Sequence, residues 1–465
     1  MWREYHEATK HTAESLRRSQ HFLEWANMPH PFRHYESAPL IDLPADPPAP
    51  ESAEPVADGA EFLSRLLFYS AAISATKEVP STGYRYALRV NPSSGNLHPT
   101  EFHFVTRGLK GWTDGLYHYR PSSHMVEQRA RGDFRLPVGD APLTFVLTSI
   151  AWREAWKYRD RAYRYCCHDI GHAWQSLELA ARAMDCEVFA RGGFADDELA
   201  LALRLNADEW PMLIVTVAGG RMPLDAAHAG TVEWSAGEAN ELSAHVVEYP
   251  WIEKIHAATK LAVWPPTAEP SPVDHPDRIP NFGEVVRSRR SALDFRGGDE
   301  TISLTTLSSI LEAAILPLAA DFGESAFIEL YVYVHRVEGL DAGVYRYADR
   351  RLHWLRTGDQ RTAAAGLSLG QNLAGNSCIT FSMIADIDRA TALFGERGYR
   401  YVYFEAGAIG QRLYLAAEAN GLGATGIGAF FDDKVHEYLG LLSGQAVYHF
   451  AIGYPVPDPR LVALL

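Results

Sequence analysis

The feature that most constrains the fold of this chain is a repeat with a period of more than two hundred residues. Gly115-Leu116-Tyr117-His118-Tyr119 returns 228 residues later as Gly343-Val344-Tyr345-Arg346-Tyr347. Tyr163-Arg164-Tyr165 returns 236 residues later as Tyr399-Arg400-Tyr401. A period of this length is too long for a solenoid unit. The chain is therefore predicted to be a tandem duplication of one domain.

Within each copy, the apolar residues follow both helical and strand periods. In the first copy they predict a helix over 61–76, strands over 101–106, 143–149 and 212–218, and a long helix over 162–184. In the second copy the helix 399–420 stops at Gly421, as a glycine C-cap would make it do. Mixed strands and long amphipathic helices predict an α+β sheet packed by helices. The predicted boundaries are a first domain over 1–264, a Pro-rich linker over 265–280 and a second domain over 281–465.

Composition narrows the partners and the compartment. The formal charge of −15 and the absence of a basic cluster argue against nucleic-acid binding. No apolar run approaches the roughly eighteen residues of a membrane span, and the polar N-terminus has no signal-peptide core. Four cysteines in so long a chain do not form a disulfide framework. We expect a cytoplasmic protein with reduced thiols and with no nucleic-acid or membrane partner.

A polar turn, Asn91–Glu101, precedes the strand-like Phe102–Val105. Its Pro, Ser, Gly and Asn residues can point backbone N–H, hydroxyl and amide groups at a planar polar ligand. The pattern Pro-Ser-Ser-x-Asn-x-x-Pro resembles the flavin-edge loop of FMN-dependent nitroreductases. Its His-Pro-x-Glu end and the segment Trp25–Tyr35 make the chain more similar to SagB/ThcOx-type dehydrogenases, which oxidise azoline rings in modified peptides.

This resemblance implies a nitroreductase-like fold, with the two copies forming a pseudo-dimer inside one chain and FMN at their interface. Copy two contains a Ser-Arg-Arg-Ser segment, a Gly-rich segment over 421–430 and a C-terminal Arg that resemble the family's phosphate and ring-binding parts. Two arginine forks and a hydroxyl suit a phosphate, and glycines let backbone lie against a flat ring. The resemblance implies these cofactor-binding residues: Pro92, Ser93, Ser94, Asn96, Arg289, Arg290, Ser291, Gly426, Gly428, Ala429 and Arg460.

The two copies have lost complementary parts. Copy one has Asp185–Phe194 where copy two has the Gly-rich segment, and copy two has Asp321–Glu329 where copy one has the turn. These complementary losses predict one composite FMN site per chain and a mirror-related position without cofactor.

Lys157 and Tyr158 resemble the catalytic pair of the SagB/ThcOx-type dehydrogenases, while copy two has Leu393 and Phe394 there. A base beside the substrate helps hydride removal by taking an acidic proton, and the lysine could lower the phenol pKa or itself become neutral. A solvated Lys-Tyr pair is the alternative. No metal site is predicted, because His168 and His172 have no evident third ligand.

The predicted function is an FMN-dependent dehydrogenase or oxidase that moves hydride between a small-molecule or modified-peptide substrate and flavin N5. Two alternatives stay open: an NAD(P)H-dependent nitro- or quinone reductase, and a non-catalytic flavin-binding partner subunit. Further association of the pseudo-dimers also stays open.

Overall fold

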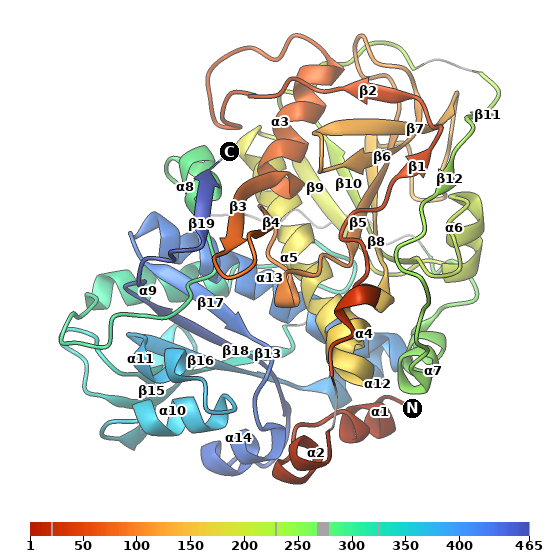
Figure 1. Cartoon of the computed structure of the whole chain (residues 1–465). Helices are drawn as coiled ribbons and strands as arrows, with labels where there is room; N and C mark the ends of the chain where they lie inside the picture. Colours follow the sequence, from red (N-terminus) through yellow and green to blue (C-terminus); the bar gives the residue numbers. More distant parts are fainter. Residues whose placement is uncertain (20–21, 228–229, 267–278, 324–325, 465) are drawn as a thin grey trace.

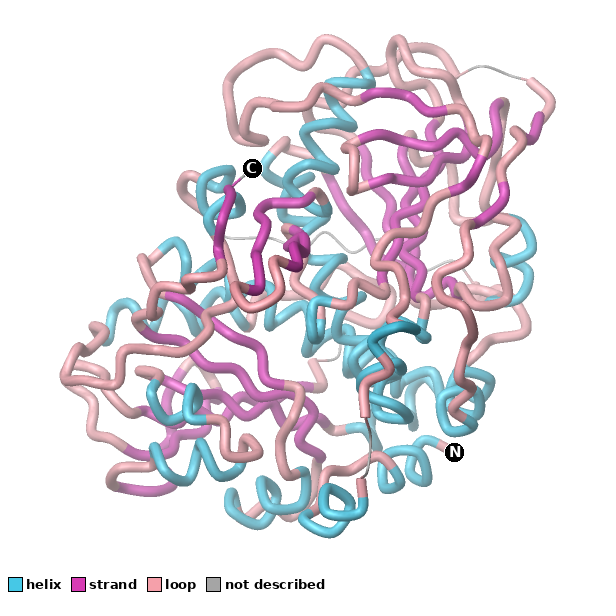
Figure 2. Tube along the Cα trace, in the orientation of Figure 1, coloured by secondary structure: helices cyan, strands magenta, loops and turns pink. Residues whose placement is uncertain are grey.

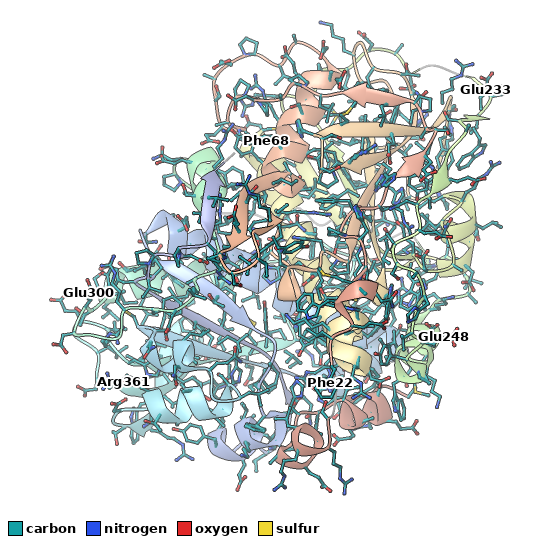
Figure 3. The ribbon with its side chains drawn as sticks, in the orientation of Figure 1. Phe22, Phe68, Glu233, Glu248, Glu300 and Arg361 are labelled. Atoms are coloured by element: carbon teal, nitrogen blue, oxygen red, sulfur yellow. The ribbon has the colours of Figure 1, made fainter. Side chains whose placement is uncertain are left out.

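A computed structural model describes residues 1–19, 22–227, 230–266, 279–323 and 326–464. Two antiparallel sheets lie at opposite ends of the molecule, with long helices between them (Figures 1 and 2). Glu233, next to the first sheet, and Arg361, at the start of a helix beside the second, mark these two ends (Figure 3).

The six central strands follow the same order in both sheets. In the first half the order is β7-β6-β5-β8-β10-β9, and in the second half it is β15-β14-β13-β16-β18-β17. The predicted duplication is thus confirmed at the level of topology. The strands of the first sheet are β5 (Thr100–Thr106), β6 (Gly115–Arg120), β7 (Met125–Arg131), β8 (Leu143–Ser149), β9 (Glu187–Arg191) and β10 (Trp210–Ala218), and those of the second are β13 (Ile328–Val334), β14 (Gly343–Ala348), β15 (Arg351–Thr357), β16 (Ile379–Ala385), β17 (Gly423–Ile427) and β18 (Gln445–Gly453).

Two helices of 22 residues, α5 (Ala162–Ala183) and α13 (Gly398–Ala419), pack against each other at the centre of the molecule. They cross at Gly171 and Gly407. A Cβ on Gly171 would overlap the carbonyl oxygen of Phe404, and a Cβ on Gly407 would overlap that of His168. Only glycine allows this approach, so the repeated glycine fixes the pseudo-dimer contact.

The predicted helix over 61–76 is wrong at its end. Helix α3 (Gly59–Ala71) stops at Ala71, and the chain continues into β3 (Ile73–Val79), which pairs with β4 (Tyr84–Arg89). The apolar Ile73 belongs to this strand and not to the helix, because it is the first residue of the β3–β4 hairpin and pairs with Arg89. The C-terminal strand β19 (Leu461–Leu464) from the second half pairs with β3 of the first. The other helices and strands predicted above are observed within about two residues, whereas β9 and β17 were not predicted.

The repeat also extends to two helices outside the matches described above. Helix α1 (Trp2–Ala8) opens the first half and α7 (Pro250–Thr259) precedes the second. The sequences His6-Glu7-Ala8-Thr9-Lys10 and His256-Ala257-Ala258-Thr259-Lys260 are identical at four of their five positions. The Thr9 hydroxyl accepts from Arg164 Nε at 3.0 Å, and the Thr259 hydroxyl accepts from Arg400 Nε at 2.8 Å. The boundary at 264 stays a prediction, and residues 267–278 of the predicted linker lie outside the described residues.

The remaining elements connect these parts. In the described part of the chain, no helix is both long and apolar enough to cross a membrane, and all four cysteines are free and buried. The other elements are α2 (Ala13–Arg18), η1 (Trp25–Asn27), β1 (Tyr35–Glu36), β2 (Leu40–Asp42), η2 (Ser94–Asn96), α4 (Ala151–Tyr158), η3 (Arg159–Arg161), α6 (Asp196–Ala202), β11 (Glu233–Trp234), β12 (Glu238–Ala239), α8 (Phe282–Ser288), α9 (Leu304–Ala314), α10 (Arg361–Leu367), α11 (Asn372–Asn376), α12 (Ile387–Phe394), η4 (Gly395–Arg397) and α14 (Asp432–Leu439).

Candidate functional site

The two halves enclose a cavity of about 320 Å³. The first half contributes the turn Asn91–Asn96 and residues of α4 and α5, and the second contributes residues before and along β17. Ten of the eleven predicted cofactor-binding residues line this cavity, and Arg460 does not: the ten are Pro92, Ser93, Ser94, Asn96, Arg289, Arg290, Ser291, Gly426, Gly428 and Ala429.

The turn is held in a conformation that needs glycine at its tip. Gly95 has φ +59°, and a Cβ there would lie 2.5 Å from the Tyr158 hydroxyl and 3.0 Å from Lys157 Nζ. The left-handed backbone continues at Asn96, with φ 61°, and His98, with φ 51°. The fold therefore brings the predicted Lys-Tyr pair, at the end of α4, directly against the predicted cofactor loop.

The side chains of the turn point at protein groups rather than freely into the cavity. Ser94 donates from its backbone N–H and its hydroxyl to the Asp169 carboxylate, at 3.1 and 3.0 Å. The Ser93 hydroxyl donates to Glu154 at 3.5 Å, and the Asn96 amide donates to a backbone carbonyl at 2.9 Å. This differs from the expectation that hydroxyl and amide donors face a ligand, because two buried carboxyl groups of α4 and α5 lie behind the turn.

Tyr158 lines the cavity as a neutral phenol. Burial raises the pKa of Tyr158, and the nearby Glu154 carboxyl raises it further. The idea that Lys157 lowers this phenol pKa is therefore wrong. The Lys157 ammonium lies 5.2 Å from the centre of the Tyr158 ring, so the two groups face the same turn. At neutral pH the phenol can donate a hydrogen bond but cannot take a proton.

Arg289 and Arg290 bring two guanidinium groups to the opposite wall. Arg289 is buried and donates to the Arg89 carbonyl at 3.1 Å, and Arg290 donates to the Ser74 carbonyl at 2.6 Å. Within the described residues, Nε and Nη1 of Arg289 and Nε of Arg290 have no hydrogen-bond partner. Burial lowers the pKa of Arg290 to about 10, and the Arg289 charge contributes. An anion here would supply the missing acceptors and offset the repulsion, so this end fits a phosphate.

The Gly-rich segment forms the floor of the cavity. Gly426 N–H donates to the Tyr414 hydroxyl at 2.9 Å, which also bonds Ser291 at 2.8 Å. The Gly428 carbonyl accepts from the Tyr165 hydroxyl at 3.0 Å. A Cβ at Gly428 would overlap the Tyr165 ring. Glycine is required here because the Tyr165 ring of the other half packs directly on the Gly428 backbone.

Arg460 lies outside the cavity. Its guanidinium donates to Asp458 at 2.7 Å, and Asp458 also pairs with Lys77 at 2.8 Å. Lys77, on β3, does line the cavity. The role of Arg460 as a phosphate ligand stays a prediction. Lys77, which shares Asp458 with Arg460, is the cation of this ion-pair cluster that lines the cavity.

Sequence reasoning missed several lining residues, namely Lys77, Arg89, Tyr165, Asp169, His172, Tyr414 and Tyr448. Tyr165 lies in the repeated Tyr-Arg-Tyr motif, which could have drawn attention to it. His168 and His172, considered above as weak metal ligands, both face Tyr448: the His168 ring stacks on it at 4.3 Å and His172 bonds its hydroxyl at 3.1 Å.

The mirror-related position is filled by the protein itself. The backbone N–H groups of Gly192 and Gly193, which correspond to Gly428 and Ala429, donate to the Asp321 carboxylate at 2.8 and 3.0 Å. The Phe322 ring stacks on Tyr401, the counterpart of Tyr165, at 4.3 Å. Residues 324–325 of the copy-two segment lie outside the described residues. A carboxylate and an aromatic ring thus occupy the place where the composite cavity has open space.

Comparison with known proteins relates both halves to one family. The sequence signature described as the nitroreductase family matches residues 69–220 and 286–454. A 165-residue stretch is 32% identical to MJ1384 of Methanocaldococcus jannaschii, named as a nitroreductase, and covers 34% of this chain and 82% of that protein. In a second comparison, a 119-residue stretch is 29% identical to the trifolitoxin operon protein TfxC of Rhizobium leguminosarum bv. trifolii, and it covers 25% of this chain and 33% of TfxC.

A crystal structure from Anabaena variabilis, described as that of a nitroreductase, resembles the chain over nearly its whole length. It has 28% identity and a TM-score of 0.79, and the match covers 98% of this chain and 99% of that one. The double-domain architecture is thus shared with a solved protein.

Proposed function

This chain belongs to the nitroreductase family of oxidoreductases, and on that premise we propose that its composite cavity binds one FMN per chain. The observation that carries this proposal is the convergence of the turn from one half with the arginines and glycine-rich strand of the other around a single cavity. The mirror-related backbone donors already bind Asp321, which supports a single site.

The two ends of the cavity suit the two ends of FMN. Arg289, Arg290 and Ser291 would hold the phosphate, since buried guanidinium N–H groups without partners favour an anion. The flavin ring would lie in the cavity against the backbone of the Gly426–Ala429 segment. The donors at Gly428 and Ala429 would face its edge, because their counterparts at Gly192 and Gly193 point at a carboxylate.

We further propose a dehydrogenase or oxidase of SagB/ThcOx type. When bound, FMN would accept the hydride that the substrate loses. Lys157, in its neutral amine form, would take the substrate proton, and Tyr158, kept neutral by burial, would donate a hydrogen bond that orients the substrate. The substrate class is a small molecule or a modified peptide bearing an azoline. Similarity to the trifolitoxin operon protein supports this type.

The test is the visible spectrum of the purified chain and the amount of flavin it releases. We expect one FMN per chain. A colourless protein that does not bind added FMN would refute the proposal, and two FMN per chain would refute the single site.

An NAD(P)H-dependent nitro- or quinone reductase is the second candidate, favoured by the 32% identity to MJ1384. Mixing the protein with NADPH and a quinone distinguishes the reductase from the dehydrogenase. Rapid flavin bleaching by NADPH supports the reductase, whereas slow bleaching supports the dehydrogenase. In the dehydrogenase, a Lys157→Ala, Tyr158→Phe variant should lose about a hundredfold or more in kcat. A variant equal to the wild type in every assay would favour the reductase or a non-catalytic subunit.

A further inference from the structure

Two buried carboxyl groups lie directly behind the turn Pro92–Asn96. Asp169, on α5, is 2% exposed and lines the cavity, and Glu154, on α4, is fully buried. Asp169 accepts from the Ser94 N–H at 3.1 Å and from the Ser94 hydroxyl at 3.0 Å. The Ser93 hydroxyl accepts from the His98 N–H at 2.8 Å and points at Glu154. Both serines of the turn are therefore held by carboxyl groups.

The second half shows which part of this arrangement is general to the fold. Glu405 stands at the position that corresponds to Asp169, and it accepts from the backbone N–H groups of Phe327 and Ile328 at 3.0 and 3.1 Å. Ala390 stands where copy one has Glu154. One helix carboxylate thus supports the segment before the first central strand in both halves, and a second carboxyl is present only beside the cavity.

From this geometry we infer that Asp169 and Glu154 are positioning residues for the cofactor turn, and that together they hold one proton: Asp169 grips Ser94 as a carboxylate while Glu154 stays a neutral acid beside Ser93. The inference rests on the proposed FMN site, because the turn is part of it. Two adjacent buried carboxyl groups cannot both ionise at low cost.

The electrostatics of the surroundings agree with this assignment. Burial raises the pKa of Asp169 to about 7, and hydrogen bonds from Ser93 and Ser94 limit the rise. Burial and then the Asp169 charge raise the pKa of Glu154 well above its usual range. The other titratable groups that interact with the pair are Lys157 and Tyr158 on α4, Cys166 and Cys167 on α5, and Tyr448 on β18.

The first test measures FMN dissociation constants for the wild type and Asp169→Asn. At pH 8.5 the variant should bind FMN about tenfold more weakly or worse, because a neutral amide oxygen accepts the Ser94 donors less strongly than a carboxylate, and the amide NH2 cannot accept from the Ser94 N–H as the second carboxylate oxygen does. The carboxylate form of Asp169 is lost as pH falls below about 7, so the ratio of the two constants should approach one at pH 5.5. Titration of the FMN phosphate cancels in this ratio. Equal or tighter binding by the variant at pH 8.5 would overturn the inference.

The matched control is Glu405→Gln, which changes the equivalent helix carboxylate in the other half. It should leave the FMN dissociation constant within about twofold of the wild type, since Glu405 contacts no part of the cavity wall described above. An equally large effect in this control would mean that Asp169 acts through general stability, which would overturn its positioning role.

The second test needs no flavin and therefore separates this inference from the proposed function. The infrared spectrum of the wild type at pH 8.5 should contain the C=O band of one buried protonated carboxylic acid. The same band should be absent from the spectrum of Glu154→Gln at this pH. A band that persists in the variant, or is missing from the wild type, would overturn the proton assignment. If the wild-type chain binds no FMN, the proposed function fails while the infrared result still decides the pair.

Discussion

The composite cavity and its mirror-related position are built on equivalent helices and strands, yet only one of them is open. In the cavity, Tyr165 stands beside Gly428 and the turn leaves space. At the mirror position, Tyr401 stands beside Gly192 in the same way, but Asp321 and Phe322 fill the space. The helical interface has kept its symmetry while the segments at the sheet ends have not. Loop segments can diverge in this way because few packing contacts constrain them.

Substitutions in the symmetric part of the interface between the two halves are expected to lower the stability of the protein most. Asp432 binds Arg164 at 2.8 Å and Arg161 at 3.1 Å, and the equivalent Asp196 binds Arg400 at 2.8 Å and Arg397 at 2.5 Å, all of them buried. Removing one partner of such a group leaves buried charge uncompensated. We expect Asp432→Asn and Asp196→Asn each to lower the free energy of unfolding by about 3–5 kcal/mol. Denaturant unfolding measures this, and a variant that costs nothing would show that the two triads are not equivalent.

The same carboxylate predicts a pH dependence. Burial alone would raise the pKa of Asp432, but Arg161 and Arg164 outweigh it and hold that pKa well below the usual range. The stability contributed by Asp432 is therefore present above the ordinary Asp pKa and is lost as pH falls through the lowered one. As pH falls from the ordinary Asp pKa to the lowered one, the stabilities of Asp432→Asn and the wild type should converge. A difference that persisted in acid would contradict this.

The next largest effect is expected at the cavity wall that contains Arg289, where a substitution should weaken FMN binding. Arg289 presents two N–H groups that lack partners among the described residues. A hydrogen bond between charged groups contributes about 1.5–3 kcal/mol, so Arg289→Ala should weaken FMN binding about a hundredfold. The exposed Arg296, which pairs with Glu300 at 3.3 Å, offers a control, and Arg296→Ala should leave the dissociation constant unchanged. Equal binding by the two variants would place the phosphate elsewhere.

This contrast also explains what the sequence could predict. The duplication, the central helices and ten cavity residues were accessible because each rests on a local motif or on a repeated one, such as Tyr163–Tyr165. The roles of Asp169 and Glu154 were not accessible, since they depend on two helices meeting behind the turn. The α1–α7 match was missed because the spacing between His6 and His256 differs from the two spacings found elsewhere. Nor could sequence alone show that Asp321 caps backbone donors, because many loop aspartates are simply solvated.

Two glycines test the cavity against its mirror at smaller scale. A Cβ at Gly428 would overlap the Tyr165 ring, and a Cβ at Gly192 would overlap the Tyr401 ring. Both alanine variants should therefore lose similar stability. Only Gly428→Ala should also weaken FMN binding, by about tenfold, because Gly428 lines the cavity and Gly192 does not. Flavin titration of both variants measures this, and a similar loss of affinity in Gly192→Ala would show that the two positions are functionally linked.

The smallest effect is expected at the filled position itself. Burial raises the pKa of Asp321, although the Gly192 and Gly193 N–H groups partly offset the rise. A raised carboxyl pKa means that the folded state binds more protons between the ordinary and the raised value, so stability falls as pH rises through that window. At neutral pH the ionisation of Asp321 therefore costs stability, which offsets part of what its hydrogen bonds contribute, and Asp321→Asn should change the free energy of unfolding by about 1 kcal/mol or less. Flavin content should stay at one FMN per chain, because Phe322 still stacks on Tyr401. A second equivalent of FMN in this variant would show that one carboxylate, and not the packed aromatic pair, keeps the mirror position closed.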